Sequence, residues 1–351
     1  MFARLVTRQS NSLAVNLKMS KEIEQNMLRK RAQKLPEVTD DMWSQVDQEH
    51  RDLVSEFLDA NSFRDKTKKQ YHSTLRQFFW WVHTSLNGKK LYKITKRDFI
   101  RYQSFLKNRG MSSSGIALKK ASVSSLNNYL ENIVAEDDPN YKTFRNFTRG
   151  LPAIPKTVTY EKVKVTYDDY KLMMDTLEED ENYLGMAWLA TAFNVGGRRA
   201  ELVQFKTEIL DYPLSQGQSY VMSHKVFGKG RGEGKVLEYM VNLEALKYMR
   251  IWHEKRGYDH EYIFTTQYGG EPKQISESWA DYFCSDVLSD ILGRRINPHL
   301  FKASCITYLL EVKKIKLELV SKYIAHHKDV STTIKHYDLR NFEEEKNQIF
   351  V

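Results

Sequence analysis

A stretch with two prolines, Gly150–Thr166, divides the sequence into two parts that differ in charge and pattern. It reads GLPAIPKTVTYEKVKVT and has little helical period, which is typical of an extended linker. Because 351 residues is long for a single domain, we expect one domain on each side. The predicted parts are an N-terminal extension over residues 1–48, a domain over 49–150, a linker over 151–166, and a domain with a C-terminal tail over 167–351.

The part before the linker has the pattern of a helical bundle. Apolar and aromatic residues of one predicted helix recur at helical spacing, which places them in a core rather than on a base-stacking face: Tyr71, Leu75, Phe78, Phe79 and Val82. A second helix has Thr95 as its N-cap and Gly110 as its end. A third follows a Ser-rich turn at 111–114, with four residues expected inward: Leu118, Val123, Leu126 and Leu130. About four helices, basic on the outside, are predicted.

The basic charge of the chain is concentrated in this bundle. Residues 61–130 carry fifteen Lys and Arg and two acids, a surplus of 13, whereas the whole chain carries +9. Such a block is the electrostatic footprint of a nucleic-acid-binding protein, and a solvated basic face is the alternative. The candidate DNA contacts are Lys66, Lys68, Lys69, Arg76, Lys119 and Lys120.

The N-terminus and the cysteine count bear on location. Residues 1–20 contain Arg4, Arg8 and Lys18, several Ser and no acid, as in an organellar transit peptide. A disordered start, or a true start at Met19, explains the same pattern. Cys284 and Cys305 are the only cysteines, which fits a reducing compartment and supplies neither a disulfide framework nor a metal site. No apolar run approaches the roughly 18–20 residues of a membrane span. We expect a cytoplasmic protein.

The part after the linker is predicted to be mainly helical with a small antiparallel sheet, an α+β domain. Two alternating segments, SYVMSHKVF and KVLEYMV, flank the turn GKGRGEG, which is typical of a β-hairpin. The remaining segments have helical patterns, and Gly196-Gly197 ends the most apolar of them.

Four side chains near the C-terminus indicate phosphate chemistry. His299 and Lys302 are three residues apart, so a helix would place them on one face, and His327 and Tyr337 follow. Imidazoles and an ammonium can bind a phosphate that gains negative charge, and a phenol beside them is a plausible nucleophile. Each residue also has a structural explanation. His299 fits a packed histidine, Arg198 a cation at a helix start, and the loop of Lys229 lacks the Walker spacing.

The order of these elements resembles the tyrosine recombinase, or phage integrase, family. The elements are, in order, G-x-R-x-x-E-L at 196–202, the GKG lysine Lys229, H-x-x-K at 299–302, HKDVSTT at 327–333, and Tyr337. The basic helical block is similar to the core-binding domain of that family. The resemblance extends from about Arg51 to Tyr337, most of the chain.

This resemblance implies a site-specific DNA recombinase (an integrase) with topoisomerase IB-like chemistry. Tyr337 would attack a DNA phosphodiester and form a 3′-phosphotyrosyl link, and Arg198 would clamp the phosphate. His299, Lys302 and His327 would surround the same phosphate, and Lys229 would protonate the leaving 5′ oxygen. No metal or other cofactor is implied. The implied partners are double-stranded DNA and copies of the chain, a tetramer on DNA that exchanges the tail Asp338–Val351. A bacterial or phage-encoded, nucleoid-associated protein is implied.

Three departures from the family pattern keep a second function open, that of a DNA-binding regulator without cleavage activity. Lys302 stands where Arg is usual, and a lysine lacks the planar fork of a guanidinium. His326 occupies a glycine position, although the HKDVSTT register favours His327 as the site histidine. Tyr337 lies one residue later than usual, with His336 in the earlier place.

Overall fold

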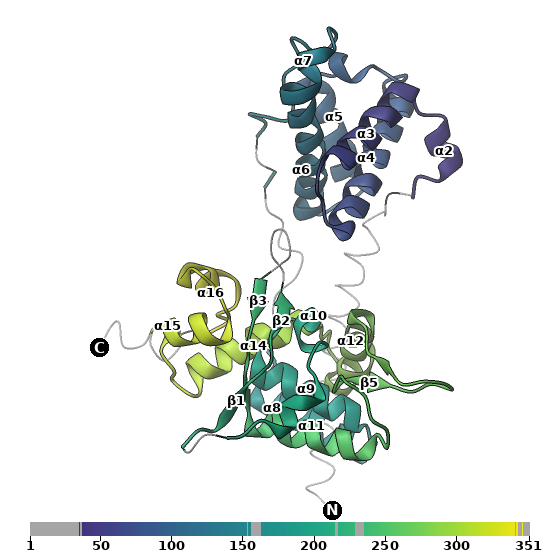
Figure 1. Ribbon diagram of the computed structural model, residues 1–351. Coiled ribbons are helices and arrows are strands. Elements are labelled where there is room, and N and C mark those ends of the chain that lie inside the picture. Colours follow the sequence, from purple (N-terminus) through teal and green to yellow (C-terminus); the bar gives the residue numbers. More distant parts are fainter. Residues whose placement is uncertain are drawn as a thin grey trace, which may run out of the picture. The chain divides into compact units, whose positions relative to one another are not determined.

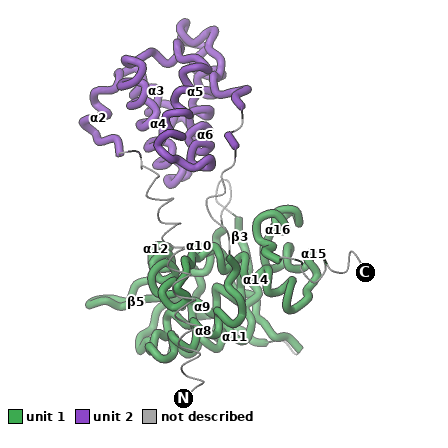
Figure 2. Tube along the Cα trace, turned by 180° about the vertical axis from the view of Figure 1, so that it is seen from behind, with its two compact units in different colours: residues 1–18, 162–351 green, residues 19–161 purple. Residues whose placement is uncertain are grey.

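The computed structural model describes residues 35, 37–152, 154–155, 163–214, 217–228, 235–340, 342 and 346. These residues form two compact units, a helical unit within 35–155 and a C-terminal unit within 163–346 (Figures 1 and 2). Among the described residues, no helix has both the length and the apolar character needed to span a membrane. Residues 1–34 of the predicted extension and residues 156–162 of the predicted linker lie outside the described residues.

The helical unit is built from helices joined by short turns, as predicted. They are α2 (Asp40–Ser44), α3 (Gln48–Ala60), α4 (Asp65–Ser85), η1 (Leu91–Lys93), α5 (Lys96–Asn108), α6 (Ser113–Tyr129), η2 (Leu130–Val134) and α7 (Ala135–Asp137). Trp43 of α2 packs against the core, so the end of the predicted extension belongs to this unit. Phe78 and Phe79 are fully buried, which confirms that these aromatic residues form the core. Thr95 caps α5 in a reciprocal capping box with Asp98.

The register of α6 differs from the prediction in one respect. Ile116, Lys119, Val123, Leu126 and Leu130 are all buried, a stripe with helical spacing. Leu118 is turned about 200° from Ile116 on the helix, and it is 45% exposed. Its predicted inward position is therefore wrong, and Lys119 takes an inward place instead.

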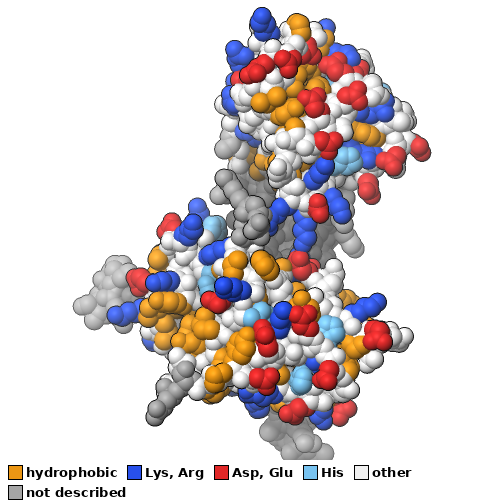
Figure 3. Space-filling model, viewed as in Figure 1, with side chains coloured by type: hydrophobic (Ala, Val, Ile, Leu, Met, Phe, Trp, Pro, Cys, Tyr) orange, Lys and Arg blue, Asp and Glu red, His pale blue; other side chains and the backbone are white. Residues whose placement is uncertain are grey.

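The exterior of the helical unit carries both signs of charge. The predicted all-basic exterior is wrong, since Asp and Glu side chains stand among Lys and Arg on the face that Figure 3 shows. The reason is that residues flanking the basic block, in α2, α3 and 131–138, bring acids to the same unit.

The C-terminal unit is mainly helical, with three two-stranded antiparallel ladders, which confirms the predicted fold class. Its helices are α8 (Tyr167–Glu179), α9 (Tyr183–Val195), α10 (Arg199–Leu202), η3 (Thr207–Asp211), α11 (Leu243–Lys255), α12 (Glu277–Tyr282), η4 (Phe283–Leu288), α13 (Ser289–Leu292), α14 (Pro298–Glu311), α15 (Leu317–Leu319), η5 (Val320–Ile324) and α16 (Val330–His336). The ladders pair β1 (Tyr220–Met222) with β4 (Met240–Asn242), β2 (Val226–Gly228) with β3 (Lys235–Leu237), and β5 (Thr265–Thr266) with β6 (Lys273–Gln274).

Helix α9 is the centre of the C-terminal unit. It is apolar on all sides and packs against α8, α11 and α14, as expected of a helix with no solvent-facing stripe. It ends at Gly196, which has a φ of +66°. A Cβ atom there would lie 2.9 Å from Cys305 Sγ of α14, so glycine is needed both for the turn and for the close approach.

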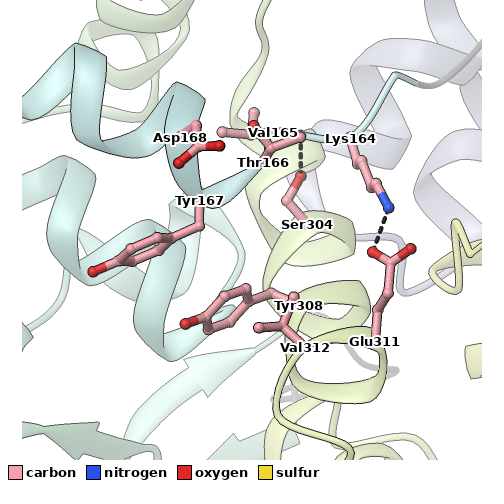
Figure 4. A pocket seen from close by; sticks show the side chains of 9 residues that line it. All are labelled: Lys164, Val165, Thr166, Tyr167, Asp168, Ser304, Tyr308, Glu311 and Val312. Carbon is pink, nitrogen blue, oxygen red and sulfur yellow. Dashed lines mark hydrogen bonds and ion pairs between the residues drawn. The ribbon is translucent and has the colours of Figure 1, made fainter.

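The last residues of the predicted linker are bound to the C-terminal unit. The Val165 amide donates to Ser304 Oγ at 2.8 Å, and Lys164 forms an ion pair with Glu311. A cavity of about 230 Å³ lies between this segment and α14, and Tyr167 and Tyr308 stack beside it (Figure 4). Tyr308 thus packs against a neighbouring helix.

Candidate active site

Arg198 is held by a glutamate three residues further along the chain. It is the N-cap residue of α10, and its Nη1 donates to Glu201 Oε1 at 2.9 Å. Its backbone N–H donates to Glu201 Oε2 at 2.7 Å. Because Glu201 fixes both the main chain and the side chain of Arg198, the remaining guanidinium donors point in a defined direction.

Glu201 is itself buried, with 1% of its surface exposed, and it accepts a further hydrogen bond from the Tyr239 hydroxyl. Burial acts to raise its pKa. The hydrogen bond from Tyr239 and the charge of Arg198 outweigh burial and hold the pKa of Glu201 below its usual value. The carboxylate is therefore ionised at neutral pH and acts as a rigid support for Arg198.

Helix α14 supplies His299 and Lys302. Asn297 caps its N-terminus and Pro298 occupies its first turn, so His299 lies exposed at the start of the helix. One turn later Lys302 is fully buried, and its Nζ donates to the Ala325 carbonyl at 3.1 Å. Burial, helped by the charge of Arg198, lowers the pKa of Lys302 to about 8. The ammonium thus lies within the site but is bound to a carbonyl and closed off from solvent.

The turn after η5 presents His327. His326 has a φ of +55°, a left-handed conformation that explains why glycine is usual at this position. His327 Nδ1 lies 2.8 Å from Thr333 Oγ1, which donates in turn to Ser321 Oγ. His327 Nε2 is a buried atom with no hydrogen-bond partner among the described residues. Burial, together with the charge of Lys302, lowers the pKa of His327 to about 4, so the ring is neutral in the free protein.

Tyr337 follows α16 and lies against the same groups. Its ring centroid is 4.8 Å from that of His327 and 5.5 Å from that of His299. Lys302 Nζ is 5.9 Å from the same centroid, and Arg198 is close enough to interact electrostatically with the phenol. Tyr337 is 7% exposed, and its carbonyl accepts from Thr307 Oγ1 at 3.2 Å.

Five of the six predicted catalytic residues therefore lie together, since Arg198, His299, Lys302 and His327 surround the Tyr337 ring. Lys229, the sixth, lies outside the described residues. The elements that carry the five lie near the place in the C-terminal unit where β2 ends and β3 begins (Figure 1). Among the described residues, no group of three or more His, Cys, Asp or Glu is placed to hold a metal ion.

Sequence reasoning missed four supporting residues. Glu201 and Thr333 belong to the sequence motifs at 196–202 and 327–333, but the motifs alone assign them no role in the site. Tyr239 and Lys235 belong to no sequence motif. Tyr239 contacts Glu201, which is 38 residues away in the chain. Lys235 contacts the His326 carbonyl, which is 91 residues away.

The six predicted DNA contacts of the helical unit differ in accessibility. Lys66 and Lys69 are exposed, and Lys120 is half-buried. Lys68 pairs with Asp59 at 2.7 Å, and Arg76 pairs with Asp40 at 2.8 Å. Lys119 was predicted to contact DNA, but its side chain is buried and donates to Gln77 within the bundle.

Known proteins share this fold. A Tn1549 transposon integrase in complex with transposon right end DNA matches with a TM-score of 0.62 at 13% identity, over 86% of this chain and 98% of that chain. The XerH site-specific recombinase bound to difH substrate, in its post-cleavage complex, matches with a TM-score of 0.62 at 15% identity, over 93% and 94%. A lambda integrase tetramer bound to a Holliday junction matches with a TM-score of 0.62 at 14% identity, over 84% and 78%.

Sequence similarity identifies the family. No protein-family model matches the chain. A curated relative, the SPbeta prophage-derived recombinase-like protein YomM of Bacillus subtilis (strain 168), is 86% identical over 333 residues, 95% of this chain and 100% of that protein. The chain belongs to the tyrosine recombinase family.

Proposed function

We propose that this protein is a site-specific recombinase that cleaves and rejoins duplex DNA through a covalent link to Tyr337. The observation that carries the proposal is the packing of the Tyr337 ring against His299 and His327, beside Lys302, within one chain. A phenol surrounded by imidazoles and cations is suited to attack a phosphate whose negative charge grows in the transition state.

In the proposed cleavage step, the Tyr337 oxygen bonds to a backbone phosphorus as the bond from phosphorus to the 5′ oxygen breaks. The phenolic proton passes to His299, which is exposed at the first turn of α14. Lys229 gives a proton to the departing 5′ oxygen. The products are a 3′-phosphotyrosyl ester and a 5′-hydroxyl, and the reverse reaction with another 5′-hydroxyl joins the strands without ATP.

Arg198 and His327 stabilise the phosphate in this proposal. Glu201 holds Arg198 so that its free guanidinium donors can grip the non-bridging oxygens. His327 is neutral in the free protein, and its Nε2 lacks a partner among the described residues. A bound phosphate brings negative charge next to the ring, which raises the pKa of His327 and turns Nε2 into a hydrogen-bond donor.

DNA would be bound through phosphate contacts that position it and a few base contacts that select the site. Lys66 and Lys69 are the exposed members of the predicted basic set. The DNA complexes among the structural relatives, one of them a tetramer, support duplex DNA as the partner and a tetramer as the active assembly. The tail Asp338–Val351, largely outside the described residues, would pack on a neighbouring copy. The prophage origin of the relative supports action on DNA in a bacterial cytoplasm.

A DNA-binding regulator without cleavage activity is the second candidate function. The observation in its favour is Lys302, whose ammonium is buried on the Ala325 carbonyl, whereas the family usually has an arginine at this position. Such a protein would bind DNA at the same surface and form no covalent bond.

A nicked suicide substrate separates the two functions, because the cleaved fragment diffuses away and traps the covalent complex. We expect the wild-type protein to form a band that resists denaturation and Tyr337→Phe to form none. Tyr323→Phe, at an exposed tyrosine, serves as the matched control and should trap DNA like the wild type. Retarded DNA without any covalent band for the wild type would support the regulator.

A further inference from the structure

Two lysines hold two successive carbonyl groups of the turn that carries His327. The last carbonyls of a helix lack donors within the helix and need partners from elsewhere. Lys302 Nζ donates to the Ala325 carbonyl at 3.1 Å, and Lys235 Nζ donates to the His326 carbonyl at 2.8 Å. Lys302 reaches the turn from the buried side, whereas Lys235 is exposed and reaches it from β3.

The contact of Lys235 fixes the peptide unit immediately before His327. The carbonyl of this unit is bound by Lys235, and its N–H, which belongs to His327, donates to the Ser321 carbonyl at 3.0 Å. With both polar atoms bound, the peptide plane cannot rotate, and this plane sets the direction in which the His327 side chain leaves the backbone. The neighbouring His326 has a φ of +55°, which non-glycine residues rarely adopt, so the turn needs such support.

Lys235 also connects this turn to the support of Arg198. Its cross-strand partner is Gly228, the last described residue before Lys229. A Cβ atom on Gly228 would lie 3.1 Å from Glu201 Oε1, so the end of β2 packs closely on the carboxylate that holds Arg198. The β2–β3 ladder therefore contacts both the arginine side and the histidine side of the site.

The charge of Lys235 also affects the ionisable groups around this turn. Its ammonium contributes to the lowered pKa values of Lys302, His326 and His327. Such an effect requires Lys235 to lie close to these groups, in agreement with the hydrogen bond to the turn.

We propose that Lys235 is a positioning residue that acts through His327, because its ammonium locks the His326 carbonyl and thereby aims the His327 ring at Tyr337. The proposal rests on the cleavage function proposed above. It assigns Lys235 a role different from that of Lys229, since Lys235 transfers no proton and holds no phosphate.

Single-turnover cleavage of the suicide substrate tests this role in the full-length protein. Lys235→Met keeps the aliphatic stem and removes the ammonium, and Lys235→Arg restores a charged donor. Because Lys235→Met loses one charge-assisted hydrogen bond, we expect its cleavage rate to fall roughly tenfold or more. Its DNA affinity should stay within about threefold of the wild-type value. Lys235→Arg should recover most of the rate. Lys225→Met, which removes an exposed lysine from the segment before β2, should cleave like the wild type.

Two further arms distinguish positioning from other roles. In a His327→Ala background, Lys235→Met should have less than about a twofold effect, because coupled residues are not additive. A substrate with sulfur in place of the bridging 5′ oxygen needs no acid for departure. This substrate should not rescue Lys235→Met. Equal losses in both backgrounds, rescue by sulfur, or a parallel loss of DNA affinity would each overturn the proposal.

An NMR titration of the His327 ring in the free protein keeps this test independent of cleavage. Lys235→Met should raise the pKa of His327 and move its ring resonances, whereas Lys225→Met should leave both unchanged. If the wild type forms no covalent complex, the proposed function fails and the titration alone decides the positioning role. An unchanged His327 titration in Lys235→Met would refute it.

Discussion

Replacement of Glu201 by glutamine tests how the site orients its arginine. Glu201 accepts three hydrogen bonds at a position with 1% exposure, from the Arg198 amide, the Arg198 guanidinium and the Tyr239 hydroxyl. Glutamine has nearly the same shape but turns one acceptor into a donor. The Arg198 backbone N–H and guanidinium are both donors only, so the new NH₂ group opposes one of them in either amide orientation, and the ion pair is lost.

The size of the effect follows from this geometry. A hydrogen bond to a charged group contributes about 1.5–3 kcal/mol, and water replaces part of it here because the Arg198 side chain is 31% exposed. We expect the free energy of unfolding to fall by about 2 kcal/mol. If the transition state for cleavage loses the same free energy of about 2 kcal/mol, the cleavage rate falls roughly 30-fold.

Urea denaturation and single-turnover cleavage measure the two effects. Glu311→Gln is the matched control, because it removes the same charge from a partly exposed ion pair with Lys164 and should change stability by under about 1 kcal/mol. The fold lowers the pKa of Glu201, so its stabilisation is complete above the usual value of 4.5 and is lost as the pH falls through the folded pKa. The stability difference between wild type and Glu201→Gln should therefore shrink below about pH 4.5. Wild-type stability and cleavage in Glu201→Gln would refute this account of Arg198.

The remaining predictions concern three other parts of the site. Since the pKa of Lys302 is about 8, wild-type cleavage should decline as the pH rises through 8. Lys302→Arg should still cleave DNA and should not show this decline. The same decline in both proteins would contradict a role for the Lys302 ammonium in cleavage. His327→Ala should reduce single-turnover cleavage roughly 100-fold. His326→Gly, which suits the left-handed φ at this position, should cleave within about threefold of the wild-type rate. Equal losses in the two variants would contradict the assignment of His327 as the histidine that binds the phosphate. Lys229→Ala should leave DNA affinity in a mobility-shift assay nearly intact and lower cleavage roughly 100-fold or more; equal losses of both would make Lys229 a DNA anchor.

Periodicity and residue order were enough to predict the fold class and to select side chains that the structure brings together. The apolar stripe of α4 and the all-apolar α9 each have one stable placement, because their hydrophobic residues must be buried. The order of the arginine, lysine, histidine and tyrosine elements could be read without coordinates, since a family pattern depends on chain order. Four of the other five predicted catalytic residues lie around Tyr337.

Side-chain direction and long-range contacts could not be predicted in the same way. In α6, Leu118 and Lys119 are adjacent, and a shift of one residue in the helical register decides which of them is buried. The burial of Lys302 depends on the Ala325 carbonyl of a distant turn, and the role of Lys235 depends on a contact with His326 across 91 residues. Neither contact leaves a repeat or a motif in the sequence.

Mass spectrometry of the trapped protein–DNA complex tests the central claim most directly. After nuclease and protease digestion, one peptide should carry a nucleotide through a phosphate, and fragmentation should place it on Tyr337. The released strand should end in a 5′-hydroxyl that polynucleotide kinase can label. A nucleotide on another residue, a 5′-phosphate on the released strand, or no modified peptide at all would contradict the proposal that this phenol cleaves DNA.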